Sequence, residues 1–504
     1  MTDYTPEVET DMLTDRDSRA VTHEELVPVS NTLLQQGFRL ALIAAHEEAD
    51  EFRIVYLFTA GPPDRRFELV LRTGTRSPAI PTLAASSFPA GRFEREMRDL
   101  YGITPEHHPL PRRLVRHQHW PQGWYPMRSD AGPPPAFASV GEPYPFVTVA
   151  GPGVYEIPVG PVHAGLIEPG HFRFSVVGET ILKLKVRLWF THKGIEKLAE
   201  GRTLDEGLPL AERISGDTAV GHSLAYCLAV EDAMQYQVPL PAAILRAILL
   251  EVERIYNHVG TLGGLCNDVG FAIAHSHAMR VREQLLRLNA DMTGHRLMRG
   301  AIFPGGAQVR TLPDLAHLSA IAADVIAFTD MALRNSIVRD RFIGTAILPG
   351  QSAHDLGALG PVSRASGDDV DARRSHPLLV VAAGGAVGTV AAGDVMARFM
   401  VRTEEISHSI DLLNRLIPQA SPGLFFGPHS PARDPVSGVG LVEGWRGTIA
   451  HRVEISNGIV TRLKIVDPSF MTWPALPVAL GATIVPDFPL TNKSFDLSYA
   501  GNDL

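Results

Sequence analysis

The first part of the chain alternates short apolar runs with polar turns, a pattern typical of β-strands. Three such runs predict strands over residues 38–43, 52–58 and 67–71. A charged segment over Phe93–Tyr101 predicts a helix that ends at Gly102. Together these elements predict a small α+β domain over residues 31–121. Residues 1–30 are polar and acidic, and their composition predicts a flexible tail.

Proline and glycine dominate residues 122–145, which predicts a linker without regular structure. Three strand-like runs follow over residues 154–159, 172–177 and 181–190. Apolar residues at three- and four-residue spacing then predict helices over residues 208–236, 241–262, 277–298, 315–338 and 395–417. Strand patterns return over residues 444–455 and 458–466, with Asn457-Gly458 as a tight turn between them. Residues 146–504 are therefore predicted to form a helix-bundle domain with small peripheral sheets, and the fold class is α+β.

Composition and charge narrow the classes of function. Of the 504 residues, 45% are apolar. The chain has 46 Lys and Arg residues and 55 Asp and Glu residues, and the resulting net charge of −9 argues against nucleic-acid binding. Two cysteines, Cys227 and Cys266, are too few for a disulfide framework or a four-thiolate iron–sulfur site. Residues 1–20 lack the apolar core of a secretory signal. The longest weakly charged run is Pro377–Gly393, which is too short to span a bilayer comfortably. This run is predicted to be a buried, glycine-bent segment. We therefore expect a cytoplasmic chain without a transmembrane segment of its own.

A loop rich in glycine and proline, Gly160–Arg173, carries the first candidate chemistry. It contains His163, Glu168 and His171, and a carboxylate beside imidazoles in a half-buried loop suits proton transfer. Residues with a purely structural role, whose polar groups are hydrogen-bonded within the fold, would look the same in the sequence. The loop alone therefore leaves both interpretations open.

Two distant segments each carry a pair of hydroxyl residues three positions apart. Ser215 and Thr218 form one pair, and Ser469 and Thr472 form the other. With thiolates this would be the spacing of metal ligands. Neutral hydroxyls are weak ligands for soft metals, and their ordinary role is to cap helices or close turns.

Several ordered stretches nevertheless resemble one known family. They are Phe93–Leu114, Gly160–Lys197, Glu212–Glu231, Gly360–Gly367 with Asp371–Arg373, Gly393–Ser409 and Val466–Thr472. The second domain resembles the large subunit of group 4, energy-converting [NiFe] hydrogenases, which is similar to the D component of respiratory complex I. The first domain resembles the C component of complex I. The chain thus looks like a fused C/D protein of the energy-converting hydrogenase-related complexes.

The resemblance places the four metal-binding cysteines of the active hydrogenases at Ser215, Thr218, Ser469 and Thr472. No thiol stands at these positions, and neutral hydroxyls do not supply the soft, anionic donors that nickel needs there. The resemblance therefore implies the hydrogenase fold, whereas the substitutions predict no bound metal and no H₂ chemistry. The proton-passing glutamate of such hydrogenases matches Glu168, which is retained.

Quinone reduction by the complex I arrangement is also disfavoured. The quinone-binding tyrosine of that family falls at Gly216 when Arg213 and Tyr226 anchor the alignment, and glycine has no phenol. Asp217, next to it, is an ionisable group where the metal would have been. The predicted proton-relay or acceptor pocket comprises Glu168, His163, His171, Asp217 and His222.

The resemblance also implies partners. They are a small subunit with a [4Fe–4S] cluster, a complex-I-like membrane subunit and antiporter-like subunits, which would hold this chain on the inner face of the cell membrane. No cofactor is expected on the chain itself, and the electron acceptor, a quinone or another molecule, stays open. Two hypotheses follow. Either the chain belongs to a redox assembly that couples electron transfer to ion translocation, or it is a structural subunit whose former metal site is plugged by hydrogen bonds.

Overall fold

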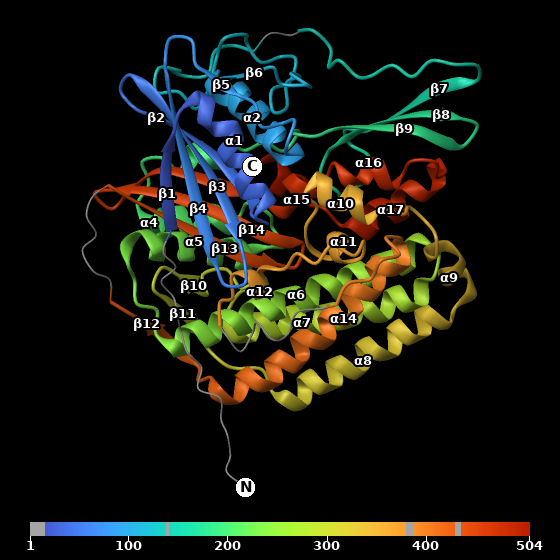
Figure 1. Cartoon of the computed structure of the whole chain (residues 1–504). Helices are drawn as coiled ribbons and strands as arrows, with labels where there is room; N and C mark the ends of the chain where they lie inside the picture. Colours follow the sequence, from blue (N-terminus) through green and yellow to red (C-terminus); the bar gives the residue numbers. More distant parts are fainter. Residues whose placement is uncertain (1–15, 138–140, 380–387, 429–434) are drawn as a thin grey trace.

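A computed structural model describes residues 16–137, 141–379, 388–428 and 435–504 of the chain (Figure 1). The N-terminal part is built on a four-stranded sheet in the order β1–β4–β3–β2. Its strands are β1 (Arg16–Val21), β2 (Arg39–Glu47), β3 (Glu51–Ala60) and β4 (Arg65–Gly74). Strand β1 runs parallel to β4, and the remaining pairs are antiparallel. The three predicted strands are therefore present, each longer than its apolar run.

The prediction of a flexible tail over residues 1–30 is wrong for residues 16–30, and residues 1–15 lie outside the described part. Residues 16–21 form β1, and α1 (His23–Gln35) begins at a capping box between Thr22 and Glu25. Polar residues misled the prediction because most of β1 is solvent-exposed, and in α1 only Leu26, Ser30 and Leu33 are buried. The Thr-x-x-Glu signature was readable in the sequence.

Helix α2 (Phe88–Tyr101) ends at Gly102, whose φ of 78° is left-handed, as the sequence predicted. It begins directly after the cap Ser87, at Phe88, five residues before the predicted start at Phe93. The parallel pair β5 (Ala79–Pro81) and β6 (Thr104–Glu106) flanks it. No helix or strand occurs among the described residues between 107 and 153. This stretch crosses from the N-terminal sheet to a separate three-stranded sheet at the upper right of Figure 1.

That second sheet consists of β7 (Val154–Val159), β8 (His171–Val177) and β9 (Thr180–Arg187), all antiparallel. Alternate residues of β8 face opposite sides. Phe172 and Phe174 are buried against Phe488, at ring-centroid distances of 4.8 and 5.0 Å. The opposite side therefore carries His171 and Arg173.

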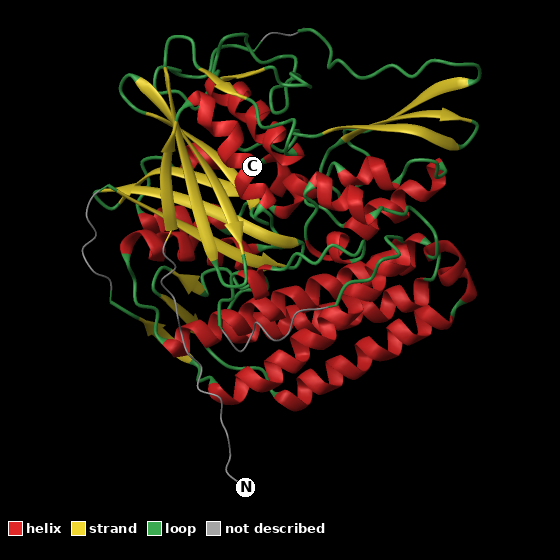
Figure 2. Ribbon diagram, viewed as in Figure 1, coloured by secondary structure: helices red, strands yellow, loops and turns green. Residues whose placement is uncertain are grey.

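The long helices form the lower layer of the molecule (Figure 2). They are α6 (Leu240–Asp268), α7 (Ala272–Thr293), α8 (Leu315–Arg334) and α14 (Val395–Leu416). By length and composition alone, α8 is long and apolar enough to cross a membrane. It packs along α7 and α14. About two thirds of its most apolar 18-residue stretch is nevertheless not buried. The predicted glycine-bent segment 377–393 falls largely on residues 380–387, outside the described part.

The helix predicted over residues 208–236 is two helices, α4 (Leu204–Ala211) and α5 (Ala219–Met234). A turn over residues 212–218 separates them, and its Ser215 and Thr218 side chains are buried. The turn redirects the chain so that α5 can pack on a third sheet. Apolar spacing continues across it, which is why the pattern alone did not show the break.

The third sheet lies in the interior and contains β13 (Val436–Gly444), β14 (Gly447–Ser456) and β15 (Ile459–Val466). The prediction of a peripheral sheet is wrong here, because one face packs on α5 and the other faces the N-terminal sheet. Strand β13 escaped prediction because glycines interrupt its apolar pattern. A Cβ at Gly440 would lie 2.0 Å from the carbonyl oxygen of Ala225 in α5, so the close approach requires glycine.

Polar contacts to one carboxylate join the interior sheet to the N-terminal part. Arg53 of β3 donates two hydrogen bonds to Glu454 of β14, at 3.0 and 2.8 Å, and His46 of β2 lies 3.2 Å from the same carboxylate. The remaining elements are α3 (Ile195–Ala199), β10 (Ile302–Phe303), β11 (Gly306–Val309), α9 (Ser336–Phe342), α10 (Gly350–Leu356), α11 (Gly360–Arg364), α12 (Ala372–Ser375), η1 (Ile417–Gln419), β12 (Gly423–Phe426), α15 (Pro468–Thr472), α16 (Ala475–Ala479), η2 (Val485–Asp487), α17 (Phe488–Phe495) and α18 (Tyr499–Asp503). The mixed α+β class is confirmed.

Candidate functional site: a buried hydroxyl network beside an ion pair

The four hydroxyl residues at cysteine positions are buried, each at most 3% exposed: Ser215, Thr218, Ser469 and Thr472. The first two lie in the turn before α5, and the last two lie in α15. Thr218 makes no capping bond to α5, whereas Asp467 caps α15 by accepting from Ser469 N–H at 2.7 Å. The ordinary capping role therefore does not account for the burial of Thr218.

Ser498 links the two segments. Its hydroxyl lies 2.8 Å from the Ser215 hydroxyl, and its backbone N–H donates to Ser469 Oγ at 2.9 Å. The same Ser498 hydroxyl accepts from Gly501 N–H at 2.9 Å, so it also caps α18. Thr472 is engaged separately, since its hydroxyl accepts from Leu359 N–H at 3.1 Å. The network thus runs through α18 and not through direct bonds among the four positions.

Asp217 and Arg446 form an ion pair at the outer side of this network. Both terminal nitrogens of Arg446 donate to the Asp217 carboxylate at 2.7 Å, and Ser215 and Thr218 donate to the same carboxylate at 2.8 and 3.0 Å. Burial alone would raise the pKa of Asp217, but the charge and hydrogen bonds of Arg446 outweigh it and hold that pKa well below its usual range. Asp217 is therefore ionised at neutral pH, with 37% of its side chain exposed.

Arg446 is held on three sides. Its guanidinium lies 3.8 Å from the centroid of the Trp445 ring, and its Nε donates to the backbone oxygen of Asp496 at 2.5 Å. Trp445 also donates to the Thr218 hydroxyl at 3.1 Å. A cation thus lies beside the positions where the hydrogenase resemblance puts metal ligands.

These residues do not fit a nickel–iron centre. The hydroxyls of Ser215 and Thr218 already donate to Asp217, and those of Ser469 and Thr472 already accept backbone N–H groups. Neutral oxygen donors that are already engaged in hydrogen bonds are poor ligands for soft metals. Among the described residues, no group of three or more His, Cys, Asp or Glu side chains is arranged to hold a metal ion.

Behind the network lies a second buried chain of polar groups. His222 Nε2 lies 2.9 Å from Asp467 Oδ2, and His222 Nδ1 lies 3.1 Å from His451 Nε2. Burial and the neighbouring His222 lower the pKa of His451 well below its usual value, so His451 is neutral. Its Nδ1 has no hydrogen-bond partner. His222 therefore faces the core and not Asp217.

The loop predicted as a proton-relay cluster is divided by the sheet. Glu168 is exposed and accepts from Ala500 N–H at 2.8 Å, while His163 lies 3.1 Å from the Tyr499 hydroxyl. Both thus contact α18, the helix that Ser498 caps. His171 lies apart, on the other side of β8, where its Nδ1 donates to the Gly160 carbonyl at 3.3 Å.

Sequence reasoning missed three residues at the centre of this site: Arg446, Ser498 and Tyr499. Each is far along the chain from the segments it contacts, and no spacing rule connects them. Glycines at 444 and 447 mark a turn around Trp445-Arg446, but a turn does not indicate which carboxylate the arginine meets.

Family models match the chain in three parts. The model for the 30 kDa subunit of respiratory-chain NADH dehydrogenase matches residues 20–135, and that for its 49 kDa subunit matches residues 268–435. The model for nickel-dependent hydrogenase matches residues 193–262.

Curated relatives extend the match over most of the chain. Formate hydrogenlyase subunit 5 of Escherichia coli (strain K12) is 33% identical over 432 residues, which cover 81% of this chain and 74% of the relative. Hydrogenase-4 component G of the same organism is 34% identical, covering 81% and 73%. The NADH-quinone oxidoreductase C/D subunit of Phocaeicola vulgatus (strain ATCC 8482 / DSM 1447 / JCM 5826 / CCUG 4940 / NBRC 14291 / NCTC 11154) is 30% identical, covering 76% and 78%.

A solved structure shows the same fold. A chain of the membrane-bound sulfane sulfur reductase, an archaeal respiratory membrane complex, superposes with a TM-score of 0.63 at 24% identity, covering 70% of this chain and 99% of that one. The family models and the relatives, together with this fold, define the class of hydrogenase-like large subunits. The chain belongs to the family of complex-I-related hydrogenase large subunits, with the 30 kDa-like and 49 kDa-like parts joined in one polypeptide and without cysteine at the four expected positions.

Proposed function

We propose that this chain is a subunit of a membrane-associated, complex-I-like oxidoreductase assembly. In that assembly it takes part in coupling electron transfer at a neighbouring [4Fe–4S] cluster to proton or ion translocation. The cluster belongs to a small partner subunit, and a complex-I-like membrane subunit and antiporter-like subunits complete the assembly on the inner face of the membrane. The relatives support this proposal, since their names include a formate hydrogenlyase, a hydrogenase-4 and NADH-quinone oxidoreductase C/D subunits.

One observation carries the rest of the proposal: the hydroxyls at the former ligand positions are buried and engaged in hydrogen bonds, beside the Asp217–Arg446 ion pair. This arrangement supports an activity of the chain other than nickel–iron H₂ chemistry. What remains is a polar surface with Asp217 half-exposed and Glu168 exposed, both linked to residues 498–500.

The loop around Glu168 has the character of an interface with another protein. Val162 and Leu166 are almost fully exposed, and Ile167 is also exposed. Apolar side chains that protrude around a carboxylate are typical of a surface that a partner covers. We assign this loop to the contact with the cluster-bearing partner, which would place Glu168 where a proton can follow an electron.

Metal analysis of the native assembly tests the first part. We expect iron and acid-labile sulfide in the amounts of partner clusters, no nickel bound to this chain, and no H₂ uptake or evolution. Stoichiometric nickel on this chain, or H₂ activity that disappears in Ser215→Ala or Ser469→Ala, would contradict it.

The Glu168→Gln variant tests the proton role. In the purified assembly reconstituted in vesicles we expect normal reduction of the clusters but reduced ion translocation. Glu179→Gln is the matched control, since Glu179 is an exposed carboxylate in the β8–β9 turn of the same sheet. Unchanged turnover and translocation in Glu168→Gln would refute the role.

A second candidate function is supported by the same closed network: a structural, coupling subunit with no chemistry of its own, its former metal site plugged. In that case Glu168→Gln and Asp217→Asn would both leave turnover intact, while loss of the whole chain would prevent assembly. Comparing the two variants with a deletion strain separates the candidates.

A further inference from the structure

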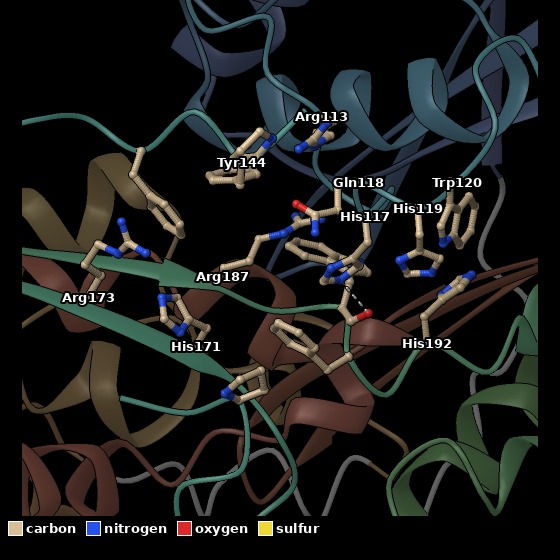
Figure 3. Close-up of a pocket in the computed structure, with 15 residues that line it drawn as sticks. Arg113, His117, Gln118, His119, Trp120, Tyr144, His171, Arg173, Arg187 and His192 are labelled. Carbon is tan, nitrogen blue, oxygen red and sulfur yellow. Dashed lines mark hydrogen bonds between the residues drawn. The ribbon is translucent and has the colours of Figure 1, made fainter. Parts of the chain in front are cut away.

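A cavity of about 660 Å³ lies between the N-terminal part and the second sheet (Figure 3). Four segments form it: residues 113–120 after β6, residues 143–146 of the stretch that links the two parts, Pro161 in the β7–β8 loop, and β8 and β9 with the loop to His192. We call it the arginine–histidine pocket. Its volume is typical of sites for small organic ligands.

The pocket is rich in cationic groups and poor in anionic ones. Three arginines and four histidines line it, and none of its fifteen lining residues is Asp or Glu. Burial lowers the pKa of Arg187 to about 10, which leaves it charged at neutral pH. Burial and the charge of Arg187 lower the pKa of His117 to about 4, so His117 is neutral. The lining therefore carries cationic arginine side chains and no carboxylate.

Three buried nitrogen atoms of the pocket have no hydrogen-bond partner: Arg113 Nε, Arg173 Nε and His171 Nε2. The other groups of these side chains are engaged. Arg113 donates to the Glu142 backbone oxygen at 2.5 Å, and Arg173 donates at 3.5 Å to Glu156, which lies outside the lining. Buried polar groups are almost always satisfied, so the two guanidinium N–H groups indicate a missing acceptor. His171 Nε2 would instead accept a hydrogen bond, because the Nδ1 of the same ring already donates to Gly160.

Flat aromatic walls complete the pocket. The guanidinium carbon of Arg173 lies 4.6 Å from the centroid of Phe146, and that of Arg187 lies 4.7 Å from Tyr144 and 5.8 Å from Trp189. Figure 3 shows Arg113 and Tyr144 on one side of the cavity and Arg173 and His171 on the other. Such walls favour a planar ring, and the guanidiniums favour an oxyanion attached to it.

We propose that the arginine–histidine pocket binds a planar aromatic anion, a ring system that carries a carboxylate or a similar oxyanion. Arg113 and Arg173 attract the anion from two sides of the cavity, and the aromatic residues hold the ring. The ligand lies on the face of β8 that carries His171 and Arg173. His163 and Tyr499, which lie beside the hydroxyl network, contact Phe172 on the opposite face of β8. The pocket and the hydroxyl network are therefore on different sides of the strand. The ligand is thus an effector or an accessory cofactor and not the species that reacts beside Ser215, and the inference does not depend on the proposed function.

Arg187 is a structural residue of the pocket and is left unchanged in the test. It donates to the backbone oxygens of Leu114, Val115 and Arg116, so it fixes the loop that carries His117. Arg113 and Arg173 each keep a free Nε and are the informative positions.

The probe is 2-naphthoate, titrated into the full-length chain by calorimetry and by tryptophan fluorescence, since Trp120 and Trp189 line the pocket. The neutral isostere 2-naphthamide is the matched ligand control. We expect saturable one-to-one binding of the carboxylate, at least about tenfold weaker binding of the amide, and a loss of about tenfold in Arg113→Gln and in Arg173→Gln. Arg287→Gln, on the exposed face of α7, should bind as the wild type does.

Three outcomes would overturn the proposal: no saturable binding, equal binding of carboxylate and amide, or unchanged binding in both arginine variants. Binding to the isolated chain that is absent from the purified native assembly would also overturn it, and would indicate that an acidic partner segment fills the pocket. If Arg173→Gln fails to fold, judged by its circular dichroism and melting temperature, the comparison of the two ligands on the wild type and Arg113→Gln still decides.

Discussion

The Asp217–Arg446 ion pair should contribute measurably to stability, and a double-mutant cycle isolates that contribution. Two charge-assisted hydrogen bonds of 2.7 Å join the pair. Such bonds contribute about 1.5–3 kcal/mol each when buried and much less when exposed, and Asp217 is 37% exposed while Arg446 is 6% exposed. We therefore expect a coupling free energy of about 2 kcal/mol between Asp217→Asn and Arg446→Gln.

The assay is urea unfolding of the full-length wild type, both single variants and the double variant at pH 7. The control cycle uses the surface pair Arg280–Asp324, whose side chains are 48% and 37% exposed at a distance of 3.0 Å. Its coupling should stay below about 0.5 kcal/mol. Each single variant of the inner pair should lose more stability than its control counterpart, because it leaves a charge or its hydrogen-bonding groups without a partner.

The pH dependence follows from the lowered pKa of Asp217. The folded state holds this carboxylate ionised at a pH where the unfolded chain has begun to bind a proton, so the stabilisation is complete above the usual Asp pKa and is lost as the pH falls below it. Wild type and Asp217→Asn should therefore converge in stability at acidic pH. A coupling free energy no larger than that of the control pair, or a difference that stays constant with pH, would refute the reasoning.

Three further predictions concern other buried groups. Ser498→Ala should lower the free energy of unfolding by about 1–2 kcal/mol, more than the cap variant Ser87→Ala, because its hydroxyl also bonds Ser215; equal losses in thermal melting would contradict this. Burial lowers the pKa of His46 to about 4 despite Glu454, so the unfolded chain binds more protons between about pH 4 and 6.5 and stability should fall as the pH drops through that window. His46→Gln should flatten that slope in pH-dependent unfolding, and an unchanged slope would rule the residue out. Burial raises the pKa of the Cys266 thiol to about 12. Its alkylation at pH 8 should therefore be about a thousandfold slower in the folded chain than in urea, as measured by mass spectrometry. Rapid labelling of the folded chain would show that this thiol is accessible to the reagent.

Local patterns predicted the long helices and the strands β2–β4, β7–β9, β14 and β15, but not the short helices of the C-terminal part. The stop at Gly102 and the Asn457-Gly458 turn were readable because each depends on a left-handed backbone that few residues adopt, and the structure has φ of 78°, 50° and 75° at these positions. Two of the errors have a common cause. Strand β13 and the division between α4 and α5 depend on contacts with distant segments, and apolar spacing does not report such contacts.

The chemistry of the candidate site was predicted in the same uneven way. Residue types alone showed that Ser215, Thr218, Ser469 and Thr472 offer oxygen where sulfur would be required, since a hydroxyl is neutral in any fold. They did not show that Ser498 connects two of these segments, or that Arg446 neutralises Asp217. They also placed His163 and His171 in one cluster, although strand alternation puts the side chains of the loop and of β8 on opposite faces of the sheet.

The amino-acid sequence by itself determined the family, the two-part organisation and the lack of thiol ligands, because these follow from ordered motifs and from the donor atoms of each residue type. Only the tertiary structure decided which polar groups meet. Contacts between residues more than 200 positions apart, such as Asp217 with Arg446, depend on how sheets and helices are stacked, and packing of the whole interior sets that arrangement.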